Sequence, residues 1–416
     1  MSARWMGSLA LVAACGGGSS PGLDATVDAD ATIAVDGDAD ASPDVEASTM
    51  TDARADGAPA CSDFLARALG TGWNHALAIE RDGALRSWGA NGSGQLGLGD
   101  SRDRASAARV ERGATRWRVV AGGSRHSCAI QEDGSLWCWG VNVHGQLGTG
   151  DTVDQPVPSR VGAESDWAEV TCGGLHSCGI RAGGTLWCWG SNPAGQLGLG
   201  SQTGDRSTPQ RVGDATGWSG LAAKARFNCA LRDGGLWCWG DNSDGQLGVG
   251  DTADRREPVR VGEGQRWARV RMGPLHTCAV TMEGALWCWG LNDYGQLGVA
   301  DAGSARTPQR VGVDVDWRLV SGGFEHTCAL KTDGSLWCWG NNALGQLGVE
   351  GTTPRRTPTR VLAGPVEDVV TGQGHTCALD GSGTVRCWGD NGYGQAGAGA
   401  PSPTRPSPGA VCGAAP

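Results

Sequence analysis

Three features of the sequence predict an all-β protein that folds as a closed seven-bladed β-propeller. A unit of about 50 residues occurs seven times, each copy carries hairpin signals without a helical period, and the two ends of the repeated region stop at neighbouring positions of the repeat. Periods of this length indicate solenoids, propellers or arrays. All-β units of this size favour four-stranded propeller blades.

Each copy is marked by Trp-Gly-x-Asn-x-x-Gly-Gln, and successive markers are 49 to 51 residues apart. The seven markers begin at Trp88, Trp139, Trp189, Trp239, Trp289, Trp339 and Trp388. Runs such as CALKTDGSLWCW place two strand-like segments on either side of an Asp-Gly turn, which is typical of antiparallel hairpins. The 71 Gly and 19 Trp therefore indicate repeated tight turns and one repeated packing position.

The ends of the repeated region predict how the ring closes. Aligned on the repeat, Cys61 falls at the phase of Arg112, and Cys412 falls at the phase of Leu362 or Glu111. We therefore expect strands from both ends to complete the last blade. A Cys61–Cys412 disulfide would then join the two ends at the seam.

The first 60 residues differ from the rest. Residues 1–14 are predicted to be a lipoprotein-type signal peptide. An apolar stretch follows Arg4 and is too short to span a bilayer. It ends in a sequence that resembles the bacterial lipobox, in which Cys15 would be the lipidated residue. An ordinary secretory signal and a mis-assigned start codon are the alternatives. Residues 15–60 are predicted to be an acidic, Asp/Ala-rich disordered tether, and residues 61–416 the propeller.

The negative charge is concentrated in that tether. Residues 16–60 hold ten acidic side chains against Arg54, so 61–416 carries only about −2 of the total −10. A nearly neutral folded region argues against nucleic acid as a partner, because nucleic-acid-binding proteins present a basic face. Contact with a membrane is expected only through the lipid anchor.

The motifs Gly-Gly-x-x-His-[Ser/Thr], Asp-Gly-x-Leu-Trp-x-Trp-Gly-x-Asn and Gly-Gln-Leu-Gly resemble the regulator of chromosome condensation repeat over roughly residues 64–412. The resemblance implies a seven-bladed β-propeller, in agreement with the count of units. The paired cysteines depart from the eukaryotic pattern and are more similar to bacterial exported members of the family.

Twelve of the 16 cysteines form six pairs at one repeat position. The pairs are Cys128–Cys138, Cys178–Cys188, Cys229–Cys238, Cys278–Cys288, Cys328–Cys338 and Cys377–Cys387. A three-residue loop ending in Gly134 makes Cys128 face Cys138, and a two-residue Asp233-Gly234 loop does the same for the fourth pair. Facing Cα atoms on antiparallel strands lie within the range of a disulfide.

The nearby His offers an alternative, a His-Cys-Cys metal site, and reduced pairs are another. In the first copy other residues occupy both cysteine positions, although His75 is present. In the fourth copy Phe227 replaces the His, although both cysteines are present. Cysteines that are gained and lost together, independently of the His, favour disulfides.

Cys172 remains as a buried free thiol. The six recurring His are expected to make structural hydrogen bonds, and the arginines that precede Val, such as Arg109 and Arg160, to form ion pairs with Asp100, Asp151, Asp251 and Asp301.

We expect a non-enzymatic binding or scaffold protein that is monomeric, exported and lipid-anchored in the bacterial cell envelope, at the outer membrane, facing either the periplasm or the surface. No catalytic, cofactor-binding or metal-binding residue is predicted, and no cofactor. The expected partner is a protein or glycan, bound by the segments that vary between copies. These segments are 101–107, 152–157, 202–207, 253–257, 302–306 and 352–356.

An enzymatic function and a nucleotide-exchange or chromatin-binding function would each require other features. An envelope polysaccharide hydrolase or lyase would need several carboxylates at one repeat position facing the channel, and none is visible in the sequence. Guanine-nucleotide exchange or chromatin binding, the role of eukaryotic relatives, would need a cytosolic protein, and for chromatin a basic face. The sequence argues against both.

Overall fold

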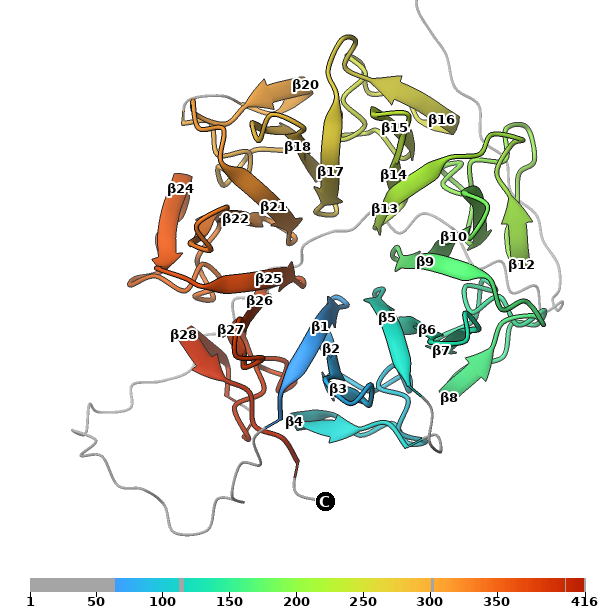
Figure 1. The fold of residues 1–416 in the computed structure, drawn as a ribbon, viewed down its shortest axis with the longest axis horizontal. Coiled ribbons are helices and arrows are strands. Elements are labelled where there is room, and N and C mark those ends of the chain that lie inside the picture. Colours follow the sequence, from blue (N-terminus) through green and yellow to red (C-terminus); the bar gives the residue numbers. More distant parts are fainter. Residues whose placement is uncertain (1–63, 112–115, 301–302, 401, 415–416) are drawn as a thin grey trace, which may run out of the picture. The chain divides into compact units, whose positions relative to one another are not determined.

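The computed structural model describes residues 64–111, 116–300, 303–400 and 402–414. These residues form seven antiparallel sheets of four strands, arranged as blades around a central axis (Figure 1). Each sheet consists of four consecutive strands, and blades 1 to 7 follow the chain from β1–β4 to β25–β28. The predicted seven-bladed propeller is confirmed. The described residues include no helix long and apolar enough to cross a membrane.

The first strand of each blade lies at the axis and the fourth at the rim (Figure 1). The innermost strands are β1 (Ala66–Thr71), β5 (Trp117–Gly122), β9 (Trp167–Cys172), β13 (Trp218–Lys224), β17 (Trp267–Met272), β21 (Trp317–Gly322) and β25 (Val366–Thr371). The second strands are β2 (His75–Glu80), β6 (His126–Gln131), β10 (His176–Arg181), β14 (Phe227–Arg232), β18 (His276–Thr281), β22 (His326–Lys331) and β26 (His375–Asp380).

The remaining two strands complete each blade toward the rim. The third strands are β3 (Leu85–Gly89), β7 (Leu136–Gly140), β11 (Thr185–Gly190), β15 (Gly235–Gly240), β19 (Leu286–Gly290), β23 (Leu336–Gly340) and β27 (Val385–Asp390). The outer strands are β4 (Arg104–Arg109), β8 (Gln155–Arg160), β12 (Arg206–Arg211), β16 (Arg255–Val261), β20 (Ala305–Arg310), β24 (Arg355–Leu362) and β28 (Thr404–Ala410).

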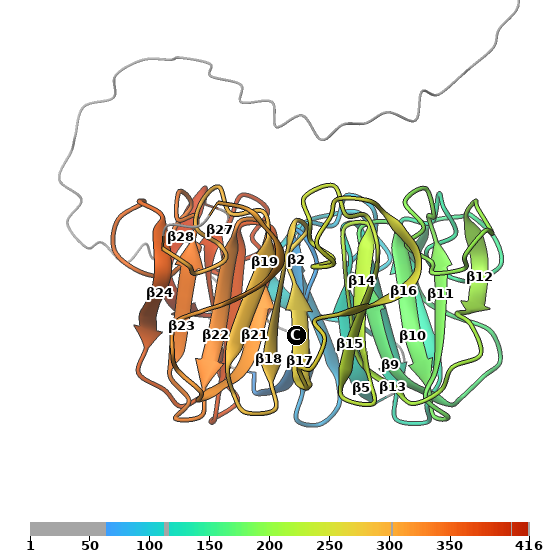
Figure 2. The same cartoon turned by 90° about the horizontal axis from the view of Figure 1, so that it is seen from above.

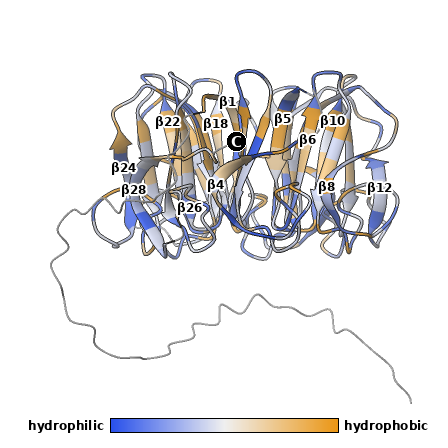
Figure 3. Cartoon of the chain, turned by 90° about the horizontal axis from the view of Figure 1, so that it is seen from below, coloured by the Kyte–Doolittle hydropathy of each residue, from blue (hydrophilic) through white to orange (hydrophobic). Residues whose placement is uncertain are grey.

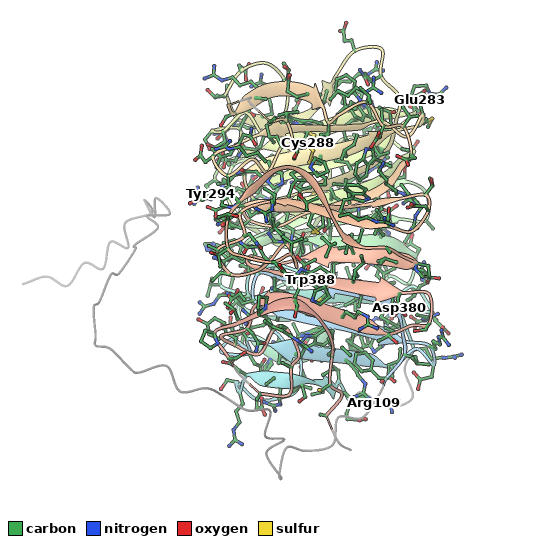
Figure 4. All side chains as sticks on the ribbon, turned by 90° about the vertical axis from the view of Figure 1, so that its left-hand side faces the viewer. Arg109, Glu283, Cys288, Tyr294, Asp380 and Trp388 are labelled. Carbon is green, nitrogen blue, oxygen red and sulfur yellow. A yellow bond between two sulfur atoms is a disulfide. The ribbon has the colours of Figure 1, made fainter. Side chains whose placement is uncertain are left out.

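Because neighbouring strands are antiparallel, the connections alternate between two ends of the ring (Figure 2). We call one the loop end: it carries the Gly-x-x-His turns and the long loops between third and outer strands. The opposite, hairpin end carries the tight turns between second and third strands and the connections between blades. Figure 4 shows Tyr294 of the loop end on one side and Glu283 and Asp380 of the hairpin end on the other.

The core lies between neighbouring blades. All seven marker tryptophans are fully buried, and each hydrophobic cluster joins side chains of two adjacent blades, as Leu136 of blade 2 and Trp189 of blade 3 do. Figure 3 shows the second strands β10 and β22 in hydrophobic colours, whereas the outer strand β12 is hydrophilic. Alternation of strand side chains explains this pattern, since both faces of a middle strand are covered by neighbouring blades.

The hairpins have the turns predicted from their loop lengths. In blade 2, Cys128 pairs with Cys138 and Gly134 has a φ of 81°. In blade 4, Arg232 pairs with Gly235, and the two turn residues Asp233 and Gly234 have φ values of 54° and 75°. Two positive φ values are what a type I′ hairpin requires, and they match the right-handed strand twist.

The prediction that strands from both ends share the last blade is wrong. Blade 7 is built entirely from β25–β28 and blade 1 entirely from β1–β4. The chain after β28 instead continues past blade 7 and runs along the outer strand β4, where Ala107 N–H donates to the carbonyl of Cys412 at 2.8 Å and Ala414 N–H donates back to Ala107 at 3.0 Å. The two ends do meet, but at the rim of blade 1. Cys61 lies outside the described residues.

Candidate functional site

The six cysteine pairs form disulfides that staple the second strand of a blade to its third. The structure joins Cys128–Cys138, Cys178–Cys188, Cys229–Cys238, Cys278–Cys288, Cys328–Cys338 and Cys377–Cys387, each with a Cα–Cα distance of 4.1 Å. The nine-residue spacing in blade 4 gives the same distance as the ten-residue spacing elsewhere, because the shorter turn preserves the register. Such bonds persist in oxidising compartments.

Cys172 is a buried free thiol at the end of β9. The pKa of this thiol is raised to about 12, chiefly because burial disfavours the thiolate. Its sulfur, the sulfur of Cys128 and a ring nitrogen of His126 lie within 4.8 Å of one another. Cys128 is bonded to Cys138, so its sulfur is not a thiolate and these three residues do not supply a three-ligand metal site.

Five of the six recurring histidines link their blade to the next, whereas the ring nitrogens of His375 have no hydrogen-bond partner among the described residues. The Nε2 atom of His75 lies 2.8 Å from the hydroxyl of Ser127, whose proton is donated to the carbonyl of Gln95 at 2.8 Å. Since that hydroxyl has a single proton, the imidazole must be the donor, with its proton on Nε2. The same link joins His126 to Ser177, His176 to Asn228, His276 to Thr327 and His326 to Thr376.

Burial keeps these imidazoles neutral. Desolvation lowers the pKa of His75, His126, His276, His326 and His375 to about 3 and that of His176 to about 4. The expected structural role is therefore supported by hydrogen bonds for five of the histidines, and by the neutral state of the buried ring for all six.

The ion pairs expected for the Arg-Val arginines are not the ones found. Asp100 pairs with Arg104 and Asp251 with Arg255, both at 2.6 Å. The Arg-Val arginines lie at or near the hairpin-end termini of the outer strands, at the opposite end of the strand from these aspartates, and Arg160 there donates to the carbonyl of Ala163 at 2.9 Å. Arg109 pairs instead with Asp82 of its own blade at 3.6 Å. Asp301 lies outside the described residues.

The loop end presents a different side chain from each blade on the same frame. In every long loop, the Gln of the marker accepts a hydrogen bond from the backbone N–H two residues before it, at 2.8–3.0 Å. The residues held in this way, which we call the tip residues, are Ser93, His144, Ala194, Asp244, Tyr294, Leu344 and Tyr393. The marker Asn holds the other side of the loop by accepting from the residue after the Gln, as Asn292 does from Leu297.

Three consecutive blades carry large apolar or aromatic tip residues. Tyr294, Leu344 and Tyr393 of blades 5, 6 and 7 are 38%, 38% and 49% exposed. In blades 2 to 4 the tip residues are smaller or polar, and the tip His144 is bonded to Asp205 at 2.7 Å. A single exposed apolar residue needs no explanation, whereas neighbouring ones on equivalent loops mark a candidate contact surface.

The variable segments expected to contact a partner begin at the loop end, in the connections between third and outer strands, and run into the first residues of the outer strands, as 101–107 runs into β4, as far as they belong to the described residues. Sequence reasoning missed the tip residues because they fall inside the marker itself. The signal was present: the position before Gly-Gln differs in almost every copy although its neighbours are constant.

Family models agree with this architecture. An RCC1-like domain model matches residues 164–414, more than half of the chain, and a model of the regulator of chromosome condensation (RCC1) repeat matches residues 82–130 and 133–180. A second RCC1 repeat model matches residues 67–95 and 117–146.

Individual relatives match shorter stretches. The chain is 42% identical over 94 residues to the ultraviolet-B receptor UVR8 of Arabidopsis thaliana, which is 22% of this chain and 21% of the receptor. It is 40% identical over 90 residues to human protein RCC2, which is 21% of this chain and 17% of that protein. The chain thus aligns with about a fifth or less of the length of these curated relatives.

Solved structures share the fold. Human WBSCR16 superposes with a TM-score of 0.70 at 23% identity, over 77% of this chain and 88% of that one. Yeast RCC1 (Prp20) bound to Kap60 superposes with a TM-score of 0.69 at 20% identity, over 89% of this chain and 91% of that one. At these identities the likeness concerns the fold alone. Together with the match over more than half of its length, the seven-bladed ring identifies this chain as a member of the RCC1-like domain family.

Proposed function

We propose that this protein is a non-enzymatic binding or scaffold protein of the bacterial cell envelope, which engages a protein or glycan partner through the loop end of its propeller. The observation that carries the proposal is the contrast between frame and tip. Seven loops have the same Asn and Gln hydrogen bonds, yet present seven positions whose side chains differ in size, charge and aromaticity. A constant frame with variable tips is how rigid scaffolds carry recognition residues.

The arc of Tyr294, Leu344 and Tyr393 is the proposed centre of contact. Tyrosine contributes a large, stiff and amphipathic surface, with two side-chain torsions to immobilise, so it binds protein and glycan surfaces at a low entropic cost. The loop frame orders the backbone of each tip residue before any partner arrives, which lowers that cost further. We propose that the protein acts as a monomer.

The location in the envelope is supported by the disulfides, which are typical of proteins in an oxidising compartment. The signal peptide, the lipidated Cys15 and the acidic tether lie outside the described residues and stay proposals. Membrane fractionation with intact-mass measurement tests them. A mature chain that begins at Cys15 and carries a diacyl adduct is expected, and a chain of unmodified mass in the soluble fraction would contradict the anchor.

Site-specific photo-crosslinking tests the binding face. A photoreactive phenylalanine analogue at Tyr294 or Tyr393 is expected to crosslink the same envelope component, protein or glycan. The matched control is Val313, which is 82% exposed but lies between β20 and β21 at the hairpin end. Crosslinking from position 313 and not from 294 or 393 would place the contact at the wrong end of the ring.

A further inference from the structure

The innermost strands surround a cavity of about 140 Å³ at the axis. Its wall is formed by small or apolar residues of all seven blades, such as Gly70, Ala121 and Val370, with two exceptions, Lys224 and Arg271. These come from neighbouring blades, Lys224 at the end of β13 and Arg271 near the end of β17. Two cations from adjacent blades therefore face an otherwise uncharged cavity.

Lys224 occupies a position that is Gly in every other blade. A Cβ on Gly72 would overlap Cε1 of His75, and the equivalent glycines of the other five blades stand against their own His in the same way. Blade 4 alone has Phe227 in place of the His, and it alone has a side chain at the Gly position. The two departures are thus physically coupled, because loss of the imidazole makes room for the lysine.

Arg271 is a second departure from the repeat. At the equivalent position the other innermost strands carry Gly70, Ala121, Thr171, Ala222, Ser321 and Val370, all of them small or medium-sized and uncharged. The chain has only two lysines among its 34 basic residues, so placing one of them at the axis is not a consequence of composition.

The two cations have spare hydrogen-bonding capacity. The Lys224 ammonium has three donors and makes one long hydrogen bond across the axis, to the Thr371 carbonyl at 3.4 Å. The Arg271 guanidinium donates to the carbonyl of Val270 at 3.3 Å. Within the described residues, neither is in a salt bridge and no carboxylate lines the cavity. Lys224 is half-buried and Arg271 is exposed. A half-buried cation without an ion-pair partner favours an anion that neutralises it.

We infer that the axial cavity binds a small oxyanion, a carboxylate or inorganic phosphate, held between Lys224 and Arg271. The guanidinium offers a planar fork that suits both anions, and the ammonium adds a point charge with free donors. Ser321 belongs to the same wall, where its hydroxyl lies 2.9 Å from the hydroxyl of Thr371. This site lies inside the ring and does not depend on the proposed role of the loop end.

The groups around Lys224 make the binding dependent on pH. Burial lowers the pKa of its amine to about 8, and the charge of Arg271 acts in the same direction. Cys172 on β9 is a neutral thiol, and the imidazoles of His75, His326 and His375, which lie close enough to sense the lysine, are neutral as well. Only the protonated amine attracts an anion, so affinity should be full below pH 8 and fall above it. The Asp368 carboxyl also senses Arg271 but does not line the cavity.

NMR of the full chain labelled with [ε-¹³C]lysine tests the inference directly, since only two signals arise. Lys331 pairs with Asp314 at 2.7 Å at the hairpin end and is the internal control. Adding inorganic phosphate, or separately succinate, at pH 7 should shift the Lys224 signal along a saturating curve and raise its titration midpoint by about one pH unit. The Lys331 signal should not move.

Saturation by phosphate alone, by succinate alone or by both supports the site and identifies the preferred anion. Arg271→Met should weaken binding about tenfold or more, whereas the control Arg310→Met, at the exposed end of β20, should leave it unchanged. The inference is overturned if neither anion moves the Lys224 signal at concentrations up to about 10 mM. It is equally overturned if both lysines shift alike, or if Arg271→Met has no effect.

Discussion

The indole Nε1 of Trp88 donates a hydrogen bond to the backbone carbonyl of Gln395 at 3.0 Å, although the two residues are 307 positions apart. Trp88 belongs to blade 1 and Gln395 to blade 7. The other six marker tryptophans donate to the marker Gln carbonyl of the preceding blade in the same way, at 2.9–3.0 Å. The seam of the ring is therefore closed by the same hydrogen bond that joins every other pair of blades.

Closure predicts that Trp88→Phe destabilises the protein. The substitution keeps an aromatic ring but removes the donor to Gln395, and leaving a buried carbonyl without its partner costs about 1–3 kcal/mol. The matched variant Trp239→Phe should cost less, because Asn228 still donates to the same Gln196 carbonyl at 2.7 Å, whereas Ala76 has no hydroxyl to do so at the seam. Urea unfolding measures both. An unchanged free energy of unfolding for Trp88→Phe would mean an open array.

The buried imidazoles predict a loss of stability in acid. In the unfolded chain they bind protons near pH 6.5, while in the folded chain they do so only near pH 3 to 4. The unfolded state therefore takes up protons first as the pH falls, so this contribution is complete above pH 6.5 and is lost toward pH 4. Between pH 7 and pH 5, the contribution of each imidazole to the free energy of unfolding falls by at most about 2 kcal/mol.

Melting temperatures at several pH values measure this effect. His276→Phe, which copies the residue of blade 4, should reduce the pH dependence by one proton. A melting temperature that does not change between pH 7 and pH 5 would show that the imidazoles are not protected from protonation.

Thiol chemistry should distinguish Cys172 from the paired cysteines. Its burial and its pKa of about 12 predict that iodoacetamide does not modify it in the native protein and does so once the chain is unfolded. The twelve cysteines of the six disulfides should become reactive only after reduction. Peptide mapping reads out each position, and alkylation of Cys138 without reductant would contradict the pairing.

The coupling between Lys224 and Phe227 predicts a compensating pair of substitutions. Phe227→His alone should destabilise blade 4, because the imidazole would be forced against the lysine Cβ, and such overpacking costs about 1–3 kcal/mol. Lys224→Gly together with Phe227→His restores the pattern of the other blades and should recover most of that loss. Additive effects of the two substitutions, measured by urea unfolding, would show that the positions are independent.

Much of the fold was predictable because the sequence repeats the same structural unit seven times. The marker spacing predicts the number of blades, and the loop lengths predict that Cys128 faces Cys138 and Cys229 faces Cys238, as the registers confirm. Local turn chemistry decides these features, and it is visible in a few consecutive residues.

The way the ring closes was not predictable from the repeat phase. The phases of Cys61 and Cys412 show that the two ends meet, but a tail that completes blade 7 and a tail that passes along blade 1 have the same phase. The pairing of Ala107 with the backbone around Cys412 decides between them. These hydrogen bonds join backbone atoms, so the residue types at these positions do not reveal them. The ion-pair prediction for Arg109 failed for a related reason, since it ignored the length of the strand that separates this residue from Asp100.

The candidate binding face was visible only in part. Variation between copies indicated the long loops. The tip residues belong to the marker motif, and the variation at their position within it did not by itself indicate a role. Their role depends on the hydrogen bond from Gln to the backbone of the tip, which requires the folded loop to be seen.

The most direct test of the binding face uses the partner that crosslinking identifies. It compares the dissociation constants of that partner for two matched double variants of this protein. Tyr294→Ser with Tyr393→Ser removes two aromatic tips at the loop end, and Val313→Ser with Val315→Ser removes two exposed apolar side chains, 82% and 57% exposed, at the hairpin end. Loss of aromatic anchors typically weakens binding by about tenfold or more. We expect that loss for the tyrosine variant and an unchanged dissociation constant for the valine variant. The opposite ranking would contradict this expectation.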